Sequence, residues 1–146
     1  MPIRRCLATA LLALLALGSC LPPDPAGGVE LELWRRTPLG AERLRDGDWA
    51  DEGDVVQLAV RSQGVRATIL SVDGRGVVTE HLAPRSVPAG WVPLDHAFEL
   101  DDAPGYERFL LLVGPTAALA AAGPEIAAGS PPPGVEIAAR IELRKP

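Results

Sequence analysis

The sequence contains very little cysteine: among its 146 residues only Cys6 and Cys20 are cysteine, and both lie in the first 20. The rest of the chain therefore has no thiol for a disulfide, a cysteine-ligated zinc site or a thiol nucleophile. The chain also lacks an apolar run that spans a bilayer as a helix, because Leu7–Leu17 has about 11 residues and a span needs about 20. A folded domain built from this chain must rely on its hydrophobic core alone.

Positive charge is also in short supply. The 14 lysines and arginines are outnumbered by 19 aspartates and glutamates, which gives a formal charge of −5 at pH 7. Removal of an N-terminal segment that includes Arg4 and Arg5 leaves 12 basic against 19 acidic residues, a formal charge of −7. A domain this acidic does not favour nucleic acid or anionic lipid as a partner.

Residue patterns typical of catalysis are missing as well. His81 and His96 are the two histidines and show no His-x-x-x-His spacing, and no serine lies in a Gly-x-Ser-x-Gly elbow. The stretch Asp73–Gly76 lacks the Lys-Ser/Thr of a phosphate-binding loop and is predicted to be a hairpin turn. We therefore expect no enzymatic activity, no catalytic residue, no zinc site and no cofactor.

The N-terminus carries the features of an export signal. Arg4 and Arg5 precede the apolar stretch Leu7–Leu17, and small residues then lead to a cysteine in the sequence Leu17-Gly18-Ser19-Cys20. This segment resembles a bacterial lipoprotein signal, whose recognition sequence reads leucine, two small residues and cysteine. An uncleaved N-terminal anchor or a buried helix is the alternative.

The lipoprotein resemblance has three consequences. Residues 1–19 are expected to be a signal peptide that is removed, and Cys20 is expected to carry acyl groups such as palmitate. Residues 20–28, rich in proline and glycine, are expected to form a flexible tether between the lipid and the domain. Leu21 follows the cysteine where an aspartate would favour the inner membrane, so the resemblance implies a lipid-anchored protein of the cell envelope that faces the periplasm, at the outer membrane of a Gram-negative host.

Residues 29–146 are expected to form a single all-β domain. Val29–Leu33 alternates apolar and charged side chains, as a half-buried antiparallel strand does, and Tyr106–Val113 is apolar enough to be covered on both faces. The expected strands are Val29–Leu33, Val55–Val60, Val65–Val72, Val77–Leu82, His96–Leu100, Tyr106–Val113 and Val135–Leu143. About seven strands with short turns predict an antiparallel β-sandwich with at most one or two short helices, and a small barrel is the alternative.

Glycine and proline mark the expected breaks between these elements. Gln63-Gly64 is predicted to be a turn, and Pro84–Pro93, with three prolines and Gly90, is predicted to be an irregular crossing. Thr116–Ala122 is rich in alanine and is expected to form a short helix that Thr116 caps and Gly123 ends.

Acidic residues gather between Arg43 and Asp54, in a stretch expected to be a loop. Counted from Asp46, this stretch fails the EF-hand pattern, because its fifth, sixth and twelfth positions are Ala50, Asp51 and Gln57. A looser divalent-cation site and a solvated loop both remain open. The candidate binding residues of this stretch are Asp46, Asp48, Asp51 and Asp54.

The three tryptophans are the other candidates for binding. Trp49 and Trp91 lie in expected loops, and Trp34 lies at the end of the first expected strand. Such rings either close the core or line a recognition surface. If they are exposed together, they form the best candidate site in the chain.

Several motifs of the mature chain resemble a bacterial domain family of unknown function that is common in myxobacterial proteins. These motifs are Gly53-Asp54 before a strand, Val72-Asp73 with a glycine turn, Leu82-Ala83-Pro84, and Leu100–Arg108, which reads Leu-Asp-Asp-Ala-Pro-Gly-Tyr-Glu-Arg. The resemblance covers roughly residues 31–113. It implies an accessory domain that follows an export signal or is attached to another protein, without known catalytic residues.

The sequence therefore predicts a non-catalytic accessory or sensory domain that a lipid anchors in the envelope. Its expected partners are the membrane, through Cys20, and another envelope protein. The alternative is a binding module for a small molecule, a glycan or a cation that uses Trp49, Trp91 and the aspartate-rich loop.

Overall fold

The computed structural model describes residues 28–146, so the predicted signal peptide, Cys20 and residues 20–27 of the predicted tether lie outside the described residues. Residues 28–146 form six strands and two short helices. These are β1 (Glu30–Thr37), β2 (Gly40–Leu44), β3 (Val55–Asp73), β4 (Val78–Glu99), β5 (Gly105–Val113), α1 (Thr116–Ala120), α2 (Ala122–Ala127) and β6 (Glu136–Lys145). No helix among residues 28–146 has the length and apolar character needed to cross a membrane.

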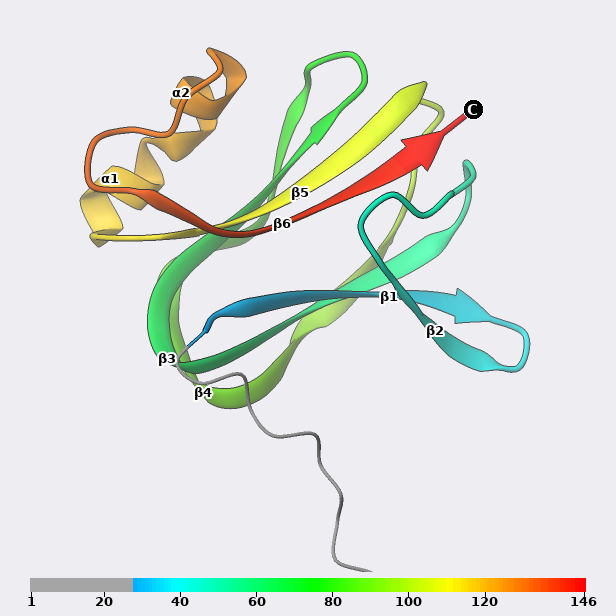
Figure 1. The fold of residues 1–146 in the computed structure, drawn as a ribbon, viewed down its shortest axis with the longest axis horizontal. Helices are drawn as coiled ribbons and strands as arrows, with labels where there is room; N and C mark the ends of the chain where they lie inside the picture. The colour runs from blue at the N-terminus through cyan, green and yellow to red at the C-terminus, as the bar shows by residue number, and fades with distance from the viewer. Residues whose placement is uncertain (1–27) are drawn as a thin grey trace, which may run out of the picture.

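All six strands belong to one antiparallel sheet that curls into a half-barrel. The order is β2-β1-β3-β5-β6, and β4 pairs with the long strand β3. The first part of β3 pairs with β1, and its last part pairs with β5. Figure 1 shows the result as two layers, with β1 and β2 below, β5 and β6 above, and β3 and β4 running through both.

The predicted all-β antiparallel class with two short helices is confirmed, but the strands are fewer and longer than expected. Gln63-Gly64 is not a turn, because β3 continues through it. Gly64 has a φ of 96°, and Gly90 on β4, which pairs with Ser62 two positions before Gly64, has a φ of 103°. These two positive-φ glycines lie within two positions of each other along the β3–β4 ladder, so they bend two neighbouring strands instead of ending them.

The segment Pro84–Pro93 is also part of a strand rather than an irregular crossing. Among the described strands, β4 pairs with β3 alone, so the other edge of β4 donates no ladder hydrogen bonds there. Proline lacks the N–H group and is tolerated on such an edge. The register of β4 against β3 shifts at three places, and these bulges add to the curl.

The curl creates two hydrophobic cores. The larger one fills the space between the two layers and is centred on Leu33, Leu58, Ile69, Phe109 and Leu111. The smaller one lies on the other face of β3 and β5, beneath the helices, and comprises Leu70, Val72, Leu110, Leu112, Leu119 and Ala122. Strand β5 is therefore covered on both faces, as its apolar sequence predicts.

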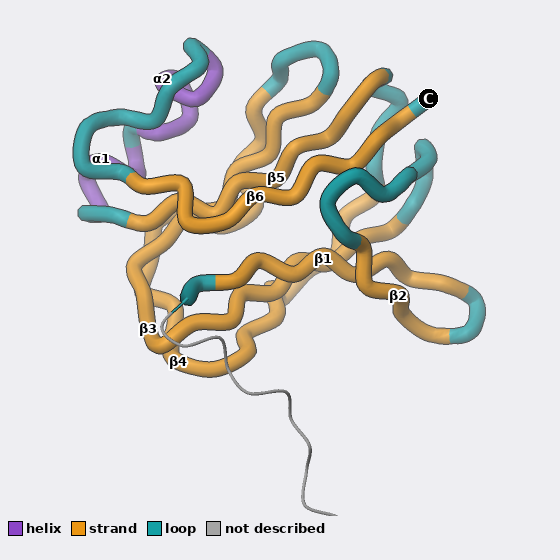
Figure 2. The backbone as a smooth tube through the Cα atoms, viewed as in Figure 1, coloured by secondary structure: helices purple, strands orange, loops and turns teal. Residues whose placement is uncertain are grey.

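The helices differ from the expected single helix over Thr116–Ala122. Thr116 does not cap α1; Pro115 stands at the N-cap position and no side-chain hydrogen bond caps the helix. Gly123 does not end the helical segment either, because the chain turns at Ala121 and continues as α2 through Gly123. Figure 2 shows both helices together at one end of the upper layer.

Candidate functional site

The outer face of the lower layer carries a cluster of tryptophan and arginine side chains around one carboxylate. Leu31 and Leu33 of β1 point into the larger core, so the alternating residues Glu32 and Trp34 lie on the opposite face. Glu32 is nevertheless only 2% exposed, because neighbouring side chains cover it. A buried carboxylate on the outside of a sheet requires several hydrogen-bond partners.

Those partners come from four strands. The indole Nε1 of Trp34 donates to Glu32 Oε2 at 3.0 Å, and the Nε1 of Trp91 on β4 donates to the same oxygen at 2.9 Å. Arg61 on β3 donates to Oε1 from Nη2 at 3.3 Å, and Arg43 on β2 places its Nη2 3.8 Å from Oε1. We call Glu32, Trp34, Arg43, Arg61 and Trp91 the tryptophan face.

The charge of Glu32 is stabilised by these contacts. Burial by itself raises the pKa of Glu32, but the two indole donors and the positive charges of Arg43 and Arg61 hold it below its ordinary value. The carboxylate therefore stays ionised at neutral pH and fixes both indole rings. Trp91 remains 48% exposed, so the face presents an aromatic surface that is held in place.

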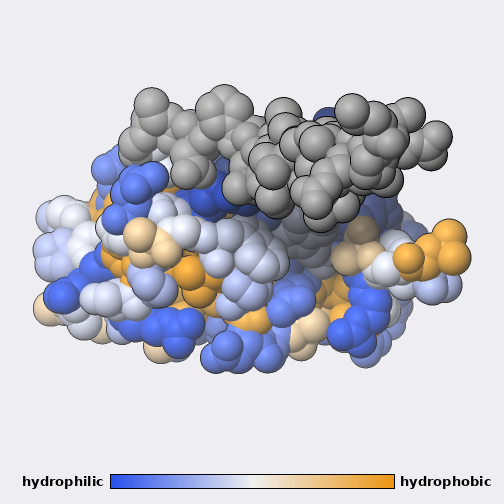
Figure 3. Space-filling view, turned by 90° about the horizontal axis from the view of Figure 1, so that it is seen from below, coloured by the Kyte–Doolittle hydropathy of each residue, from blue (hydrophilic) through white to orange (hydrophobic). Residues whose placement is uncertain are grey.

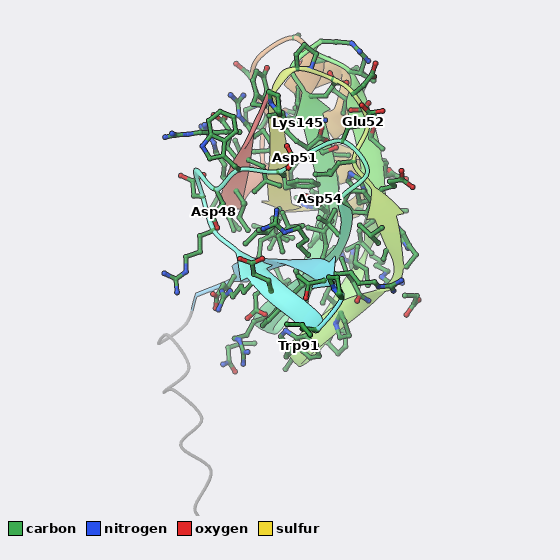
Figure 4. The ribbon with its side chains drawn as sticks, turned by 90° about the vertical axis from the view of Figure 1, so that its right-hand side faces the viewer. Asp48, Asp51, Glu52, Asp54, Trp91 and Lys145 are labelled. Atoms are coloured by element: carbon green, nitrogen blue, oxygen red, sulfur yellow. The ribbon has the colours of Figure 1, made fainter. Side chains whose placement is uncertain are left out.

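Trp91 and Trp49, the two tryptophans predicted as binding residues, do not share a surface. Trp49 is 60% exposed and lies in the loop between β2 and β3, where it forms a bridge to Arg144 of β6. Figure 4 shows Trp91 at the lower end of the molecule, apart from the loop that carries Asp48, Asp51 and Asp54. Trp34, at the end of the first expected strand, is the tryptophan that joins Trp91 on Glu32.

The aspartate side chains of this loop mainly accept hydrogen bonds from backbone amides. Asp46 Oδ1 accepts the amide of Glu142 at 2.9 Å, which ties the loop to β6. Asp48 Oδ2 accepts the amide of Arg45 at 2.7 Å, and Asp54 Oδ2 accepts the amide of Asp51 at 3.0 Å. Within residues 28–146, no three His, Cys, Asp or Glu side chains are placed to hold a metal ion together.

A second polar cluster, inside the curl, was not found by sequence reasoning. Ser71 Oγ lies 2.9 Å from His81 Nε2 and also forms a hydrogen bond with Glu107. A bulge pairs Ile69 with Leu82 and Leu70 with Glu80, which leaves His81 as an extra residue directed inward. The alternation in Ile69-Leu70-Ser71 places Ser71 on the core face, but the sequence gives no sign that His81 and Glu107 meet it there.

Burial shifts the acid–base properties of this second cluster. It lowers the pKa of His81 to about 4, with a smaller contribution from His96, and it raises the pKa of Glu107. Ser71 is only 1% exposed. A serine so buried, next to a histidine that is such a weak base, is poorly suited to act as a nucleophile at neutral pH.

Comparisons with known proteins add no relative: no family model, no curated protein and no solved structure matches this chain significantly.

Proposed function

We propose that this protein is a lipid-anchored, non-catalytic domain of the bacterial envelope that binds another envelope protein through the tryptophan face. One observation carries the proposal: two indole rings from β1 and β4 are fixed on a single buried carboxylate, with two arginines beside it. Tryptophan and arginine dominate the residues that contribute most to protein–protein binding.

The fixed geometry favours recognition by contact. Rings that are already held lose little conformational freedom when a partner covers them, so more of the contact energy remains for affinity. Figure 3, which views the molecule from the side of the lower layer, shows small hydrophobic areas among hydrophilic side chains on the part of the surface that the grey atoms leave visible. Mixed surfaces of this kind are typical of non-obligate protein interfaces.

The predicted anchor would keep this face close to the membrane. Strand β1 begins at Glu30, ten residues after Cys20, and ten residues span at most about 35 Å. Glu30 pairs with Arg43, a member of the tryptophan face. We therefore propose that the partner is an envelope protein that reaches the periplasmic side of the same membrane. On the sequence motifs, we also propose that the domain belongs to the myxobacterial family of unknown function.

The test is a pull-down from detergent-solubilised envelopes of the host, quantified by mass spectrometry. The wild-type chain is expected to recover a specific partner, and Trp91→Ala is expected to reduce the recovery at least about tenfold. Trp49→Ala is the matched control, because it removes an equally large exposed ring elsewhere on the domain. Equal recovery by both variants, or no specific partner at all, contradicts the proposal.

The anchor is tested separately by metabolic labelling with palmitate. Wild-type protein is expected to incorporate the label and to sediment with membranes, and Cys20→Ser is expected to lose both properties. If Cys20→Ser sediments with membranes as before and neither chain takes up label, the lipid anchor is wrong. The contact proposal would then need a different means of reaching the envelope.

A further inference from the structure

A cavity of about 350 Å³ lies inside the curl, between residues from the two ends of β4. His81 comes from the first part of β4 and Phe98 from the last part, and their ring centroids are only 4.3 Å apart. Phe109 on β5 lies beneath both rings, with its centroid 5.6 Å from that of His81 and 5.8 Å from that of Phe98. The cavity therefore has an aromatic wall that the curl of a single strand builds.

The cavity also has a buried carboxylate, Glu107. This side chain is only 7% exposed, and no ion pair holds it within residues 28–146. Lys145, the cation whose charge acts on it, donates its Nζ to the backbone oxygen and the carboxylate of Asp101 at 2.7 Å and 2.9 Å. Ser71 is the hydrogen-bond partner of Glu107, and a neutral hydroxyl does not compensate a buried negative charge.

The lining has an excess of acidic side chains, although it also holds His81 and His96, and Asp101 pairs with Lys145. Five carboxylates line the cavity, and no lysine or arginine among the described residues does so; the five are Asp73, Glu80, Glu99, Asp101 and Glu107. Glu80 and Glu99 are exposed at its rim, one on each end of β4. The potential inside a concave site whose walls carry an excess of negative charge is focused, so the cavity attracts positive charge.

The spacing of these groups selects the type of cation. Among the residues that the structure describes, no three acidic or histidine side chains come close enough to hold one metal ion. The carboxylates are spread around an aromatic wall, and aromatic faces attract organic cations. An ammonium group on an apolar body would place its charge near Glu107 and its body against Phe98.

We propose that this cavity is a binding site for a small organic cation, an ammonium group carried on an apolar or aromatic body. The site lies inside the curl, and the tryptophan face lies outside it. It is independent of the proposed partner contact, and either function can fail without the other.

Three probes of similar shape and different charge test the proposal: benzylamine, benzyl alcohol and benzoate, titrated at pH 8 by calorimetry or by NMR shifts of residues around the cavity. Wild-type protein is expected to bind benzylamine with a Kd at least about tenfold lower than that of benzyl alcohol, and to show no binding of benzoate. Shifts are expected at Phe98, His81 and Glu107. Equal binding of amine and alcohol, binding of benzoate, or no binding of benzylamine below about 10 mM overturns the proposal.

Glu107→Gln identifies the site, because it keeps the shape of the side chain and a partner for Ser71 while it removes the charge. It is expected to reduce the preference for benzylamine over benzyl alcohol to less than about threefold. Trp91→Ala is the matched control on the outer face and is expected to keep the preference. Should Glu107→Gln fail to fold, the double variant of the exposed rim residues, Glu80→Gln with Glu99→Gln, is expected to weaken benzylamine binding about threefold or more. An unchanged preference in the folded variant contradicts the assignment.

Discussion

Trp34 and Trp91 donate their indole N–H groups to the same atom, Oε2 of Glu32, although they lie 57 positions apart in the sequence. Trp34 lies on β1 and Trp91 on β4, and these two strands do not pair with each other, because β3 lies between them. The shared acceptor therefore joins the two rings across the middle strand. This relationship makes Glu32 the residue on which the shape of the tryptophan face depends.

Replacement of Glu32 tests that dependence. Glu32→Gln keeps the volume but leaves the positive charges of Arg43 and Arg61 without their buried counter-charge, so we expect a loss of about 2–3 kcal/mol in the free energy of unfolding. Urea denaturation followed by tryptophan fluorescence measures the loss. Glu42→Gln is the control, because Glu42 pairs with Arg35 at the surface and its loss is expected to cost less than about 1 kcal/mol. Equal costs for the two variants would show that Glu32 has no special role.

The hairpin between β3 and β4 depends on Gly74. A Cβ atom at this position would lie 1.6 Å from the backbone oxygen of Pro104, so Gly74→Ala is expected to cost about 3 kcal/mol or more. Gly123→Ala is the matched control, since nothing lies within 4 Å of its added Cβ and alanine favours helix α2. It is expected to raise stability by about 0.5–1 kcal/mol. Thermal unfolding distinguishes the two, and a similar Tm for both contradicts the packing argument.

His81 is expected to make the domain less stable in acid. Its pKa is about 4 in the folded chain and about 6.5 in an unfolded chain, so the unfolded state binds the proton more tightly. The contribution of His81 to the free energy of unfolding is fully present above pH 6.5. It is lost as the pH falls toward 4, and the loss reaches up to roughly 3 kcal/mol. An NMR titration of the folded protein is expected to give a midpoint near 4 for the His81 ring. A midpoint near 6.5 would show that the ring is not desolvated.

Glu107 is expected to act in the opposite direction. Burial raises its pKa in the folded chain, so the stability it contributes is present below its unfolded pKa and is lost as the pH rises through the folded value. At pH 7 the wild-type domain therefore carries the cost of a buried charge, and Glu107→Gln is expected to be more stable. Below about pH 4 the difference is expected to vanish. Chemical denaturation at both pH values checks this, and a wild type that is more stable than the variant at pH 7 would contradict it.

The sequence predicts the local features of the fold well. The alternation of apolar and charged residues places Leu31 and Leu33 in the core, and the apolar Phe109–Val113 correctly indicates a strand that is covered on both faces. The sequence indicates the ends of the strands less well. In the sequence, Gly64 and Gly90 resemble glycines of turns. In the structure they lie within the continuous β3–β4 ladder, where their positive φ bends the strands.

The candidate sites depend on contacts that one sequence does not contain. Trp91 was predicted from its residue type, but its neighbours Glu32 and Trp34 come from β1 and meet it only through the register of β3. Ser71 and His81 meet because of one bulge, and a bulge changes which side chains face inward without any strong sequence sign. The turn between β3 and β4 is another feature that the sequence predicts only in part. The glycine with positive φ is Gly76, whereas Gly74 is required because the backbone of Pro104 packs closely against it.

The most direct measurement of the central claim is photocrosslinking in the living host. A photoreactive phenylalanine is placed at Arg36, an exposed residue of β1 beside the tryptophan face, and at Trp49 as the control position. We predict a discrete adduct with one envelope protein from position 36, none from position 49, and loss of the adduct when Trp91→Ala is added. No adduct from position 36, or the same adducts from both positions, would contradict the claim that this face binds a partner.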